Sequence, residues 1–186
     1  MVQDRLLGIS GSLRFGSTNR KLLREAARLY GDSGFTEANL RLPLYDGDLE
    51  DREGIPPEVE ALAQQIAAAD AVIISTPEYN KALSGVLKNA FDWVSRTSGK
   101  PWRDKPVAIM SAAAGRSGGE LAQSSLRLCL VPFRARVLAG PELMLAQSAQ
   151  QFDANGRLIN ERAEKSLAEL MRALSAEVRL ARTAAE

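Results

Sequence analysis

A stretch near the start of the chain combines glycines with side chains that can hold an anion. Residues 8–19 begin at the end of a short apolar run and precede apolar residues at helical spacing, which predicts a strand-to-helix turn. Glycines let backbone N–H groups approach a ligand, and a helix starting near Ser17 adds the positive end of its dipole. The donors predicted to hold a phosphate are Ser10, Ser12, Arg14, Ser17, Thr18 and Asn19.

Two better-known phosphate-binding loops do not match this stretch. A P-loop ends in Gly-Lys-Ser/Thr, and Gly16-Ser17-Thr18 lacks the lysine. The dinucleotide fingerprint needs Gly-x-Gly-x-x-Gly, and the glycines at 8, 11 and 16 have other spacings. Taken alone, the stretch is also compatible with a connecting loop that binds nothing, because loops favour serine and glycine.

The elements that must position this loop alternate between strands and helices along the chain. After the first strand at 6–9, strands are predicted at 35–44, 71–74, 107–110 and 135–138, and helices at 18–30, 57–70, 83–94, 121–131 and 167–178. Pro43 indicates that the strand at 35–44 ends early or lies at an edge of the sheet. The acidic segment 45–51 is predicted to be a solvated loop, because its carboxylates lack the spacing of a calcium loop. This alternation predicts an α/β fold, in which a doubly wound parallel sheet forms the middle of three layers.

Two further polar loops follow predicted strands. Residues 76–80 follow the strand at 71–74, and residues 111–119 follow the strand at 107–110. In a parallel sheet the carboxyl ends of the strands share one edge, where ligands bind at the point of strand-order reversal. The sequence therefore predicts that these loops and the turn at 10–19 converge on one crevice, which weakens the interpretation of an empty loop.

Composition limits the class of protein. The chain has 186 residues, of which 45% are hydrophobic, and this favours a single domain over residues 1–186. The 24 basic and 23 acidic residues nearly cancel, so neither nucleic acid nor an anionic membrane is expected as a partner. The apolar run at 71–74 is too short to span a bilayer, and the N-terminus starts no secretory signal.

The residues that the chain lacks limit its chemistry. The chain has no histidine, which removes the commonest general base and the usual zinc ligand, and no metal site is predicted. Its one cysteine, Cys129, lies among leucines and is interpreted as a core residue rather than a nucleophile. A lone cysteine also excludes an internal disulfide framework and favours a cytoplasmic protein. If the protein is an enzyme, its chemistry is expected to belong to a cofactor.

The aromatic residues of the predicted helix 83–94 leave two interpretations open. Phe91 and Trp93 are bulky and lie on adjacent faces of this helix. Trp93 either packs against a second subunit or covers the rim of its own core.

Two motifs together resemble a known family. These are Gly11-Ser12-Leu13-Arg14-x-x-Ser17-x-Asn19, and Pro77-Glu78-Tyr79-Asn80 followed by Gly85-x-Leu87-Lys88-Asn89-Ala90-x-Asp92-Trp93. They closely resemble the NADPH-dependent FMN reductase family, and in particular its bacterial quinone, azo-dye and chromate reductases. The resemblance extends over nearly the whole chain. It implies a flavodoxin-like fold with five strands in the order 2-1-3-4-5, a non-covalent FMN, NADPH or NADH as co-substrate, and homodimers that pair into homotetramers.

The same resemblance assigns roles to individual positions. The first loop would hold the FMN phosphate, and no residue would act as a catalytic acid or base, because flavin N5 carries the chemistry. Ring contacts are implied for Pro77, Glu78, Tyr79, Asn80, Ser111, Ala112 and Gly115. Tyr79 and Arg116 are candidates for contact with NAD(P)H or the acceptor. Subunit contacts are implied for Arg127 and Glu142, while Ser124 stands where relatives have a tyrosine.

The resulting prediction is an FMN-dependent NAD(P)H oxidoreductase that works by a ping-pong mechanism. Quinones, azo compounds, chromate and ferric complexes are the small-molecule acceptors considered. One alternative is a flavodoxin-type electron carrier, which the net charge of +1 disfavours because such carriers tend to be strongly acidic for docking. Another is a regulatory protein that shares the fold and binds no flavin.

Overall fold

A computed structural model describes residues 3–183 of the chain, so residues 1–2 and 184–186 of the expected domain lie outside the described residues. The strands are β1 (Asp4–Ser10), β2 (Ser33–Glu37), β3 (Ala71–Thr76), β4 (Pro106–Ala112), β5 (Arg136–Val137) and β6 (Met144–Leu145). The α-helices are α1 (Thr18–Tyr30), α2 (Gly47–Glu53), α3 (Pro57–Ala68), α4 (Gly85–Val94), α5 (Glu120–Leu130) and α6 (Glu161–Thr183), and short 3₁₀ helices occur at Val131–Phe133 and Ser148–Gln150.

The sheet has the order β2-β1-β3-β4-β5, and every pairing in it is parallel. The predicted strand order is therefore confirmed. The predicted number of five strands is wrong, because the short strand β6 also pairs with β4. β5 lies along the start of β4 at 106–107 and β6 along its end at 111–112, so two pieces of chain share the fifth position.

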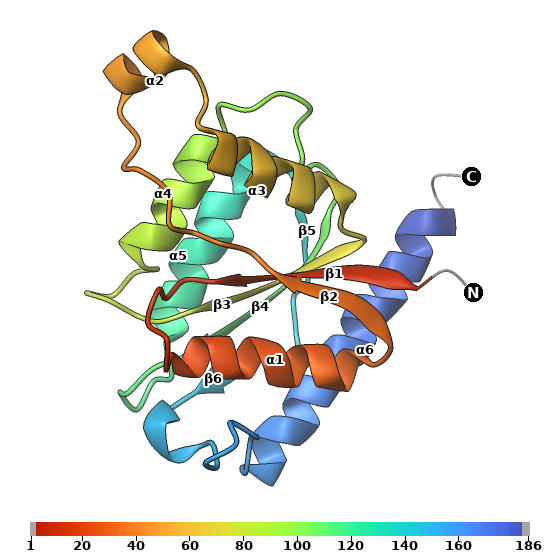
Figure 1. Cartoon of the computed structure of the whole chain (residues 1–186). Helices are drawn as coiled ribbons and strands as arrows, with labels where there is room; N and C mark the ends of the chain where they lie inside the picture. The colour runs from red at the N-terminus through yellow and green to blue at the C-terminus, as the bar shows by residue number, and fades with distance from the viewer. Residues whose placement is uncertain (1–2, 184–186) are drawn as a thin grey trace.

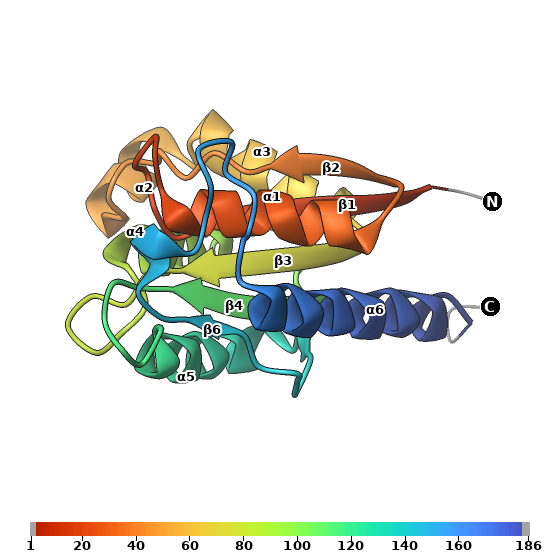
Figure 2. The ribbon, with the colours of Figure 1, turned by 90° about the horizontal axis from the view of Figure 1, so that it is seen from below.

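Helices cover both faces of the sheet and form the predicted three layers (Figures 1 and 2). β3 and β4 are buried along their whole length, as expected for strands that are covered on both faces. Alternate residues of β3 enter different cores: Ile73 packs with α1 and α6, whereas Val72 and Ile74 pack with α3, α4 and α5. In Figure 2, α1 and α6 lie in front of the sheet.

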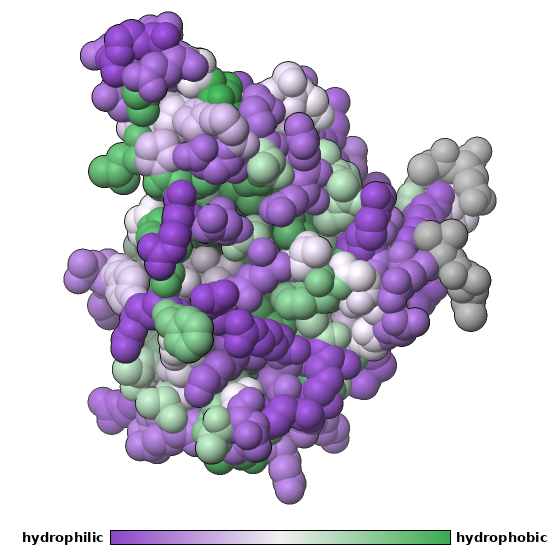
Figure 3. Space-filling view, viewed as in Figure 1, coloured by the Kyte–Doolittle hydropathy of each residue, from purple (hydrophilic) through white to green (hydrophobic). Residues whose placement is uncertain are grey.

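Residues 35–51 differ in part from the expected elements. The strand at 35–44 lies at the edge of the sheet and ends early, as Pro43 indicated. It ends at Glu37, however, and Leu44 is 81% exposed although Leu40 is buried, so the alternating leucines do not mark one continuous strand. The acidic segment predicted as a loop contains the helix α2. Asp46 caps this helix by accepting a hydrogen bond from the backbone N–H of Asp48. None of the α2 residues is buried, and Figure 3 shows this helix as a hydrophilic projection of the surface.

Trp93 covers its own core and is not available to a second subunit. Its side chain is 0% exposed, and its indole Nε1 donates a hydrogen bond of 2.8 Å to the carbonyl of Pro43. Tyr45 packs edge-on against the same indole, with ring centroids 5.0 Å apart. The expected subunit contact through Trp93 is therefore wrong, because the segment at 43–45 occupies that face of the ring.

Within residues 3–183, no helix combines the length and the apolar character that crossing a membrane requires. In the same part of the chain, no cluster of histidine, cysteine, aspartate and glutamate side chains could hold a metal ion.

Candidate active site

The three predicted loops meet at the carboxyl edge of the sheet, at the ends of β1, β3 and β4 (Figure 2). They enclose a cavity of about 340 Å³, which suits a small organic ligand. The first loop and α1 line it with Ser12, Arg14, Gly16, Ser17, Thr18 and Asn19, the second loop with Pro77, Glu78 and Tyr79, and the third with Ala112, Ala113 and Ala114. The predicted convergence is confirmed.

The first loop presents unpaired donors at the start of α1. Ser17 caps the helix by accepting a hydrogen bond of 3.2 Å from the backbone N–H of Asn19, and no acidic residue occupies the first turn. The N–H groups of Gly16 and Thr18, which line the cavity, have no acceptor within residues 3–183. Unpaired N–H groups at a helix N-terminus form an anion site, so these residues fit a phosphate group.

Asn19 has a different role from the one expected. Its side chain is 2% exposed, and its amide nitrogen donates a hydrogen bond of 2.9 Å to the carbonyl of Ala112. Its amide oxygen accepts from the Ser75 hydroxyl at 2.7 Å and from the Ala112 N–H at 3.0 Å. Because these groups belong to β3 and β4, Asn19 connects the first loop to the ends of both strands.

Ser10 and Ser111 also use their hydroxyls inside the protein. The Ser10 hydroxyl donates to the carbonyl of Ser12 and accepts from the Ser12 N–H, so it shapes the first loop. The Ser111 hydroxyl donates to the carbonyl of Gly118 at 2.7 Å and accepts from the Gln123 amide at 2.9 Å. Neither side chain lines the cavity, and the expected direct contacts of these hydroxyls with the cofactor are corrected to supporting roles.

The second loop is fixed at two points. The Glu78 carboxylate accepts hydrogen bonds from the backbone N–H groups of Leu121 at 3.0 Å and Ala122 at 3.2 Å, and so caps α5, whose N-cap residue Gly119 has no side chain. Tyr79 and Ala82 exchange backbone hydrogen bonds around a tight turn. Asn80 lies in this turn with a φ of 50° and does not line the cavity, and its contact with the ring stays a prediction.

The third loop contributes a wall of small residues and an exposed rim. Ala112, Ala113 and Ala114 line the cavity, whereas Gly115 and Arg116 are exposed and do not. Gly115 instead accepts a backbone hydrogen bond from Gln147 at 3.3 Å. The contact of Gly115 with the ring stays a prediction.

Sequence reasoning missed a fourth segment of the cavity. Ser148 and Ala149 line it, and the Thr18 hydroxyl donates a hydrogen bond of 3.0 Å to the Ser148 hydroxyl. This segment follows β6, whose two residues pair with the end of β4. A short strand after an irregular connection gives no periodic signal, so the sequence offered little that could have located it.

Cys129 is remote from this chemistry. Its half-buried thiol packs against the core on the α5 side, and burial raises its pKa. A raised pKa disfavours the thiolate, in agreement with its interpretation as a structural residue.

The residues expected to contact a second subunit lie on the α5 side of the molecule. The Arg127 guanidinium donates a hydrogen bond of 2.8 Å to the carbonyl of Leu138, and Glu142 is exposed. The Ser124 hydroxyl donates to the carbonyl of Glu120 within its own helix.

The parallel sheet of this order, with a phosphate-type cavity at its carboxyl edge, defines a flavodoxin-like nucleotide-binding protein. The chain belongs to the NADPH-dependent FMN reductase family, whose profile matches residues 5–150. It is thus an oxidoreductase with FMN as cofactor and NAD(P)H as co-substrate, and its acceptors are small molecules.

Individual relatives support this assignment. The chain is 44% identical over 177 residues to NAD(P)H-dependent FMN reductase PA1204 of Pseudomonas aeruginosa, covering 94% of this chain and 95% of that protein. It is 43% identical over 145 residues to the quinone reductase of Escherichia coli K12, covering 75% and 76% respectively. The solved structure of FerB, an NAD(P)H:acceptor oxidoreductase of Paracoccus denitrificans, superposes with a TM-score of 0.84 at 32% identity, covering 95% of this chain and 97% of FerB.

Replacing Glu78 with alanine tests whether the cap on α5 also holds the second loop. Loss of a helix cap costs about 1 kcal/mol, and loop residues 77–79 would no longer be tied to α5. We expect this loss in thermal unfolding, together with FMN affinity about tenfold weaker in fluorescence titration, equivalent to about 1.4 kcal/mol. Glu120→Ala is the matched control, since Glu120 lies in the first turn of α5 and is exposed. Equal FMN affinity in the two variants would contradict the positioning role.

Proposed function

We propose that this protein reduces quinones at an FMN held in the cavity between the three loops, and that NAD(P)H and the acceptor use the same exposed part of that cavity in turn. The observation that carries the proposal is the convergence of these loops around unpaired N–H groups at the start of α1. Azo compounds, chromate and ferric complexes are further acceptors in this proposal. Transfer from an accessible ring depends on proximity and reduction potential more than on specific contacts.

The proposed phosphate site consists of the Gly16 and Thr18 N–H groups, the hydroxyls of Ser12 and Ser17, and the Arg14 guanidinium. These donors are neutral apart from Arg14, and the helix dipole adds positive potential. The flavin ring is proposed to lie against 77–79 and 112–114. Asn19, Ser10 and Ser111 are proposed to position these loops rather than to contact the cofactor.

Residues 12–18, 77–79 and 112–114 would hold FMN, which would supply two-electron transfer between NAD(P)H and the acceptor. A quinone would leave as the hydroquinone, with one of its two added protons from the hydride and the other from solvent. The chain provides the surroundings for that chemistry. Backbone N–H groups of the second and third loops are proposed to favour negative charge on the pyrimidine end of the ring. The absence of any histidine agrees with a reaction that needs no side-chain acid or base.

The rim of the cavity is the proposed entrance for both substrates. Tyr79 is 54% exposed and lines the cavity, so its ring is available to stack on a planar substrate. Arg116 is exposed at the tip of the third loop and is proposed to attract the phosphates of the nicotinamide cofactor.

Anaerobic mixing of the FMN-loaded protein with NADPH or NADH tests this function. We expect the flavin absorbance to bleach and then to return when a quinone is added. Initial rates at several fixed quinone concentrations should give parallel double-reciprocal lines, the pattern of a ping-pong mechanism. A flavin that stays oxidised with both nicotinamide cofactors would reject the function, whereas intersecting lines would reject only the shared use of the cavity.

We propose that residues 1–186 form a single domain, that the protein works in the cytoplasm, and that it assembles as a homodimer or homotetramer with Arg127 and Glu142 near a subunit contact. The lone cysteine supports the cytoplasmic location. The exposed position of Glu142 leaves it available to a second subunit.

A further inference from the structure

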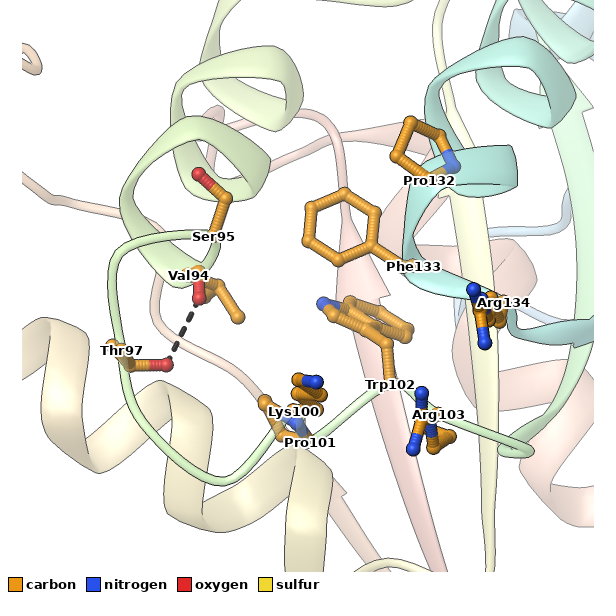
Figure 4. Close-up of a pocket in the computed structure, with 10 residues that line it drawn as sticks. All are labelled: Val94, Ser95, Thr97, Lys100, Pro101, Trp102, Arg103, Pro132, Phe133 and Arg134. Atoms are coloured by element: carbon orange, nitrogen blue, oxygen red, sulfur yellow. Dashed lines mark hydrogen bonds between the residues drawn. The ribbon is translucent and has the colours of Figure 1, made fainter.

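A second cavity lies at the opposite edge of the sheet from the candidate active site. Its volume is about 330 Å³, which is within the range that small organic ligands occupy. Figure 4 shows the side chains that line it, which come from the end of α4, from the segment before β4 and from the segment before β5. β4 separates this cavity from the third loop by about 20 Å, because its seven residues rise about 3.3 Å each.

The cavity contains a buried donor without an acceptor. Trp102 is 2% exposed, and its indole Nε1 has no hydrogen-bond partner within residues 3–183. In Figure 4 this nitrogen points away from Arg103 and Arg134 and toward Val94. A buried N–H that stays unpaired costs about 1–3 kcal/mol, so such groups are rare and call for an explanation. A ligand that brings an acceptor atom would supply one.

Positive charge surrounds the same cavity. Lys100, Arg103 and Arg134 all line it, and none of them pairs with a carboxylate within the described part of the chain. The acidic residue beside them in sequence, Asp104, is 3.9 Å from Arg136 and does not line the cavity. All three side chains are exposed, so they line the mouth of the cavity. Cations that line the same cavity as an unpaired donor favour a ligand with a negatively charged acceptor, because charge strengthens a hydrogen bond.

The remaining lining is mostly apolar, apart from Ser95 and Thr97, whose hydroxyls donate to the backbone carbonyls of Asp92 and Val94. The rings of Trp102 and Phe133 lie with centroids 6.3 Å apart and at an angle of 56°, and Pro101, Pro132 and Val94 complete the apolar lining. Such walls suit a planar apolar body, since aromatic rings pack well in offset or tilted arrangements.

We propose that this cavity binds a small aromatic carboxylate. The ring of the ligand packs against the apolar walls, and its carboxylate accepts a hydrogen bond from Trp102 Nε1. Lys100 lies against the same space and pairs with the carboxylate, while the two arginines add positive potential around the entrance. The proposal does not depend on the function proposed for the other cavity.

Two-dimensional NMR of the indole N–H groups tests this site, with benzoate added to the FMN-saturated protein. The chain has two tryptophans, and Trp93 already donates to the Pro43 carbonyl, so it serves as the internal reference. We expect benzoate to shift the Trp102 signal saturably within about 10 mM and to leave the Trp93 signal in place. Benzamide, which has the same ring without the charge, and acetate, which has the charge without the ring, should each bind at least tenfold more weakly.

Substitutions separate the two interactions of the carboxylate. Lys100→Gln and Trp102→Phe should each weaken benzoate binding about tenfold. Because Trp102→Phe lacks the indole N–H, its binding is measured from the NMR signal of benzoate. Lys165→Gln is the matched control, because Lys165 is exposed on α6, across the sheet from the cavity. No saturable shift of Trp102, equal binding of benzamide, or equal affinity in Lys100→Gln and Lys165→Gln would overturn the proposal.

Discussion

Replacing Asn19 with alanine is expected to lower the free energy of unfolding by about 3 kcal/mol and to weaken FMN binding by at least tenfold. The side chain makes three buried hydrogen bonds, two with the backbone of Ala112 and one with the hydroxyl of Ser75. Each such bond contributes about 1 kcal/mol, and the partners left behind would be buried without a replacement. Ser75 is 0% exposed, so solvent cannot take over the lost contact.

The loss of FMN affinity follows from position rather than from a lost contact. Asn19 holds the start of α1 against the ends of β3 and β4, and both flanking loops contribute to the cavity. Without this connection the Gly16 and Thr18 N–H groups would no longer be fixed relative to 112–114. A site whose donors move loses the benefit of being organised in advance.

A second asparagine on α4 provides the control for this prediction. Asn89 donates a hydrogen bond to the carbonyl of Pro43 and accepts one from the Tyr45 N–H, away from the cavity. Asn89→Ala should therefore lose stability but keep its FMN affinity. Both variants are measured by denaturant unfolding and by FMN titration at a temperature where circular dichroism shows them folded. An Asn19→Ala protein that binds FMN like the Asn89→Ala protein would contradict the argument.

The sequence predicted the parts of the fold that follow from strong periodicity. The buried run at 71–74 became β3, and the helical spacing of 83–94 became α4. Continuous apolar runs and helical spacing report burial directly, because each element must turn its apolar side to the core. The prediction that the loops converge followed from the parallel sheet, because the carboxyl ends of its strands share one edge. It required no prediction of individual side-chain contacts.

The sequence could not predict what each polar side chain of the site does. Asn19 and Ser10 have the right chemistry for a phosphate, but the structure uses both to hold backbone groups. The same donor can serve a ligand or a buried carbonyl, and only the fold decides which acceptor lies within reach. Ser148, in contrast, lines the cavity although the sequence did not indicate it. It lies beside Thr18, from which 130 residues separate it.

Segments with weak local preferences caused the remaining errors. The 35–44 region contains alternating leucines, yet Leu44 is exposed because the chain has already left the sheet. The short helix α2 forms because Asp46 caps it and acidic residues occupy its first turn. These features favour a helix start, but the high charge of the segment led to the prediction of a solvated loop. Trp93 was ambiguous because its partner, the segment at 43–45, is distant in sequence.

Replacing Glu25 with glutamine is expected to destabilise the protein by about 3 kcal/mol at neutral pH. Glu25 is 3% exposed, and its carboxylate accepts hydrogen bonds from Arg28 at 3.0 and 3.1 Å and from the Leu158 N–H at 3.2 Å, with Arg157 at 3.0 Å. Glutamine has the same shape, but its NH₂ group would face the N–H groups of the arginines and Leu158 and could not accept hydrogen bonds from them. Hydrogen bonds to a charged group contribute about 1.5–3 kcal/mol each, and partial rehydration of the two exposed arginines limits the total.

The pH dependence of this loss identifies its cause. Burial alone would raise the pKa of Glu25, but the hydrogen bonds from Arg28 and Leu158 and the charges of both arginines together lower this pKa below its ordinary value of 4.5. A lowered pKa means that the carboxylate stabilises the folded state above pH 4.5 and that this contribution disappears as the pH falls through the folded-state pKa. Wild type and Glu25→Gln should therefore converge in stability toward low pH.

Glu164 offers a matched control, because it also pairs with Arg28 but its side chain is 38% exposed. Exposed ion pairs contribute about 0–1 kcal/mol, so Glu164→Gln should change the free energy of unfolding little at any pH. Denaturant unfolding of the three FMN-saturated proteins between pH 7 and the lowest pH at which all remain folded measures both effects. If the gap between wild type and Glu25→Gln stayed constant over this range, the buried charge would not be its source, and lost packing between α1 and the segment around Leu158 would have to account for it.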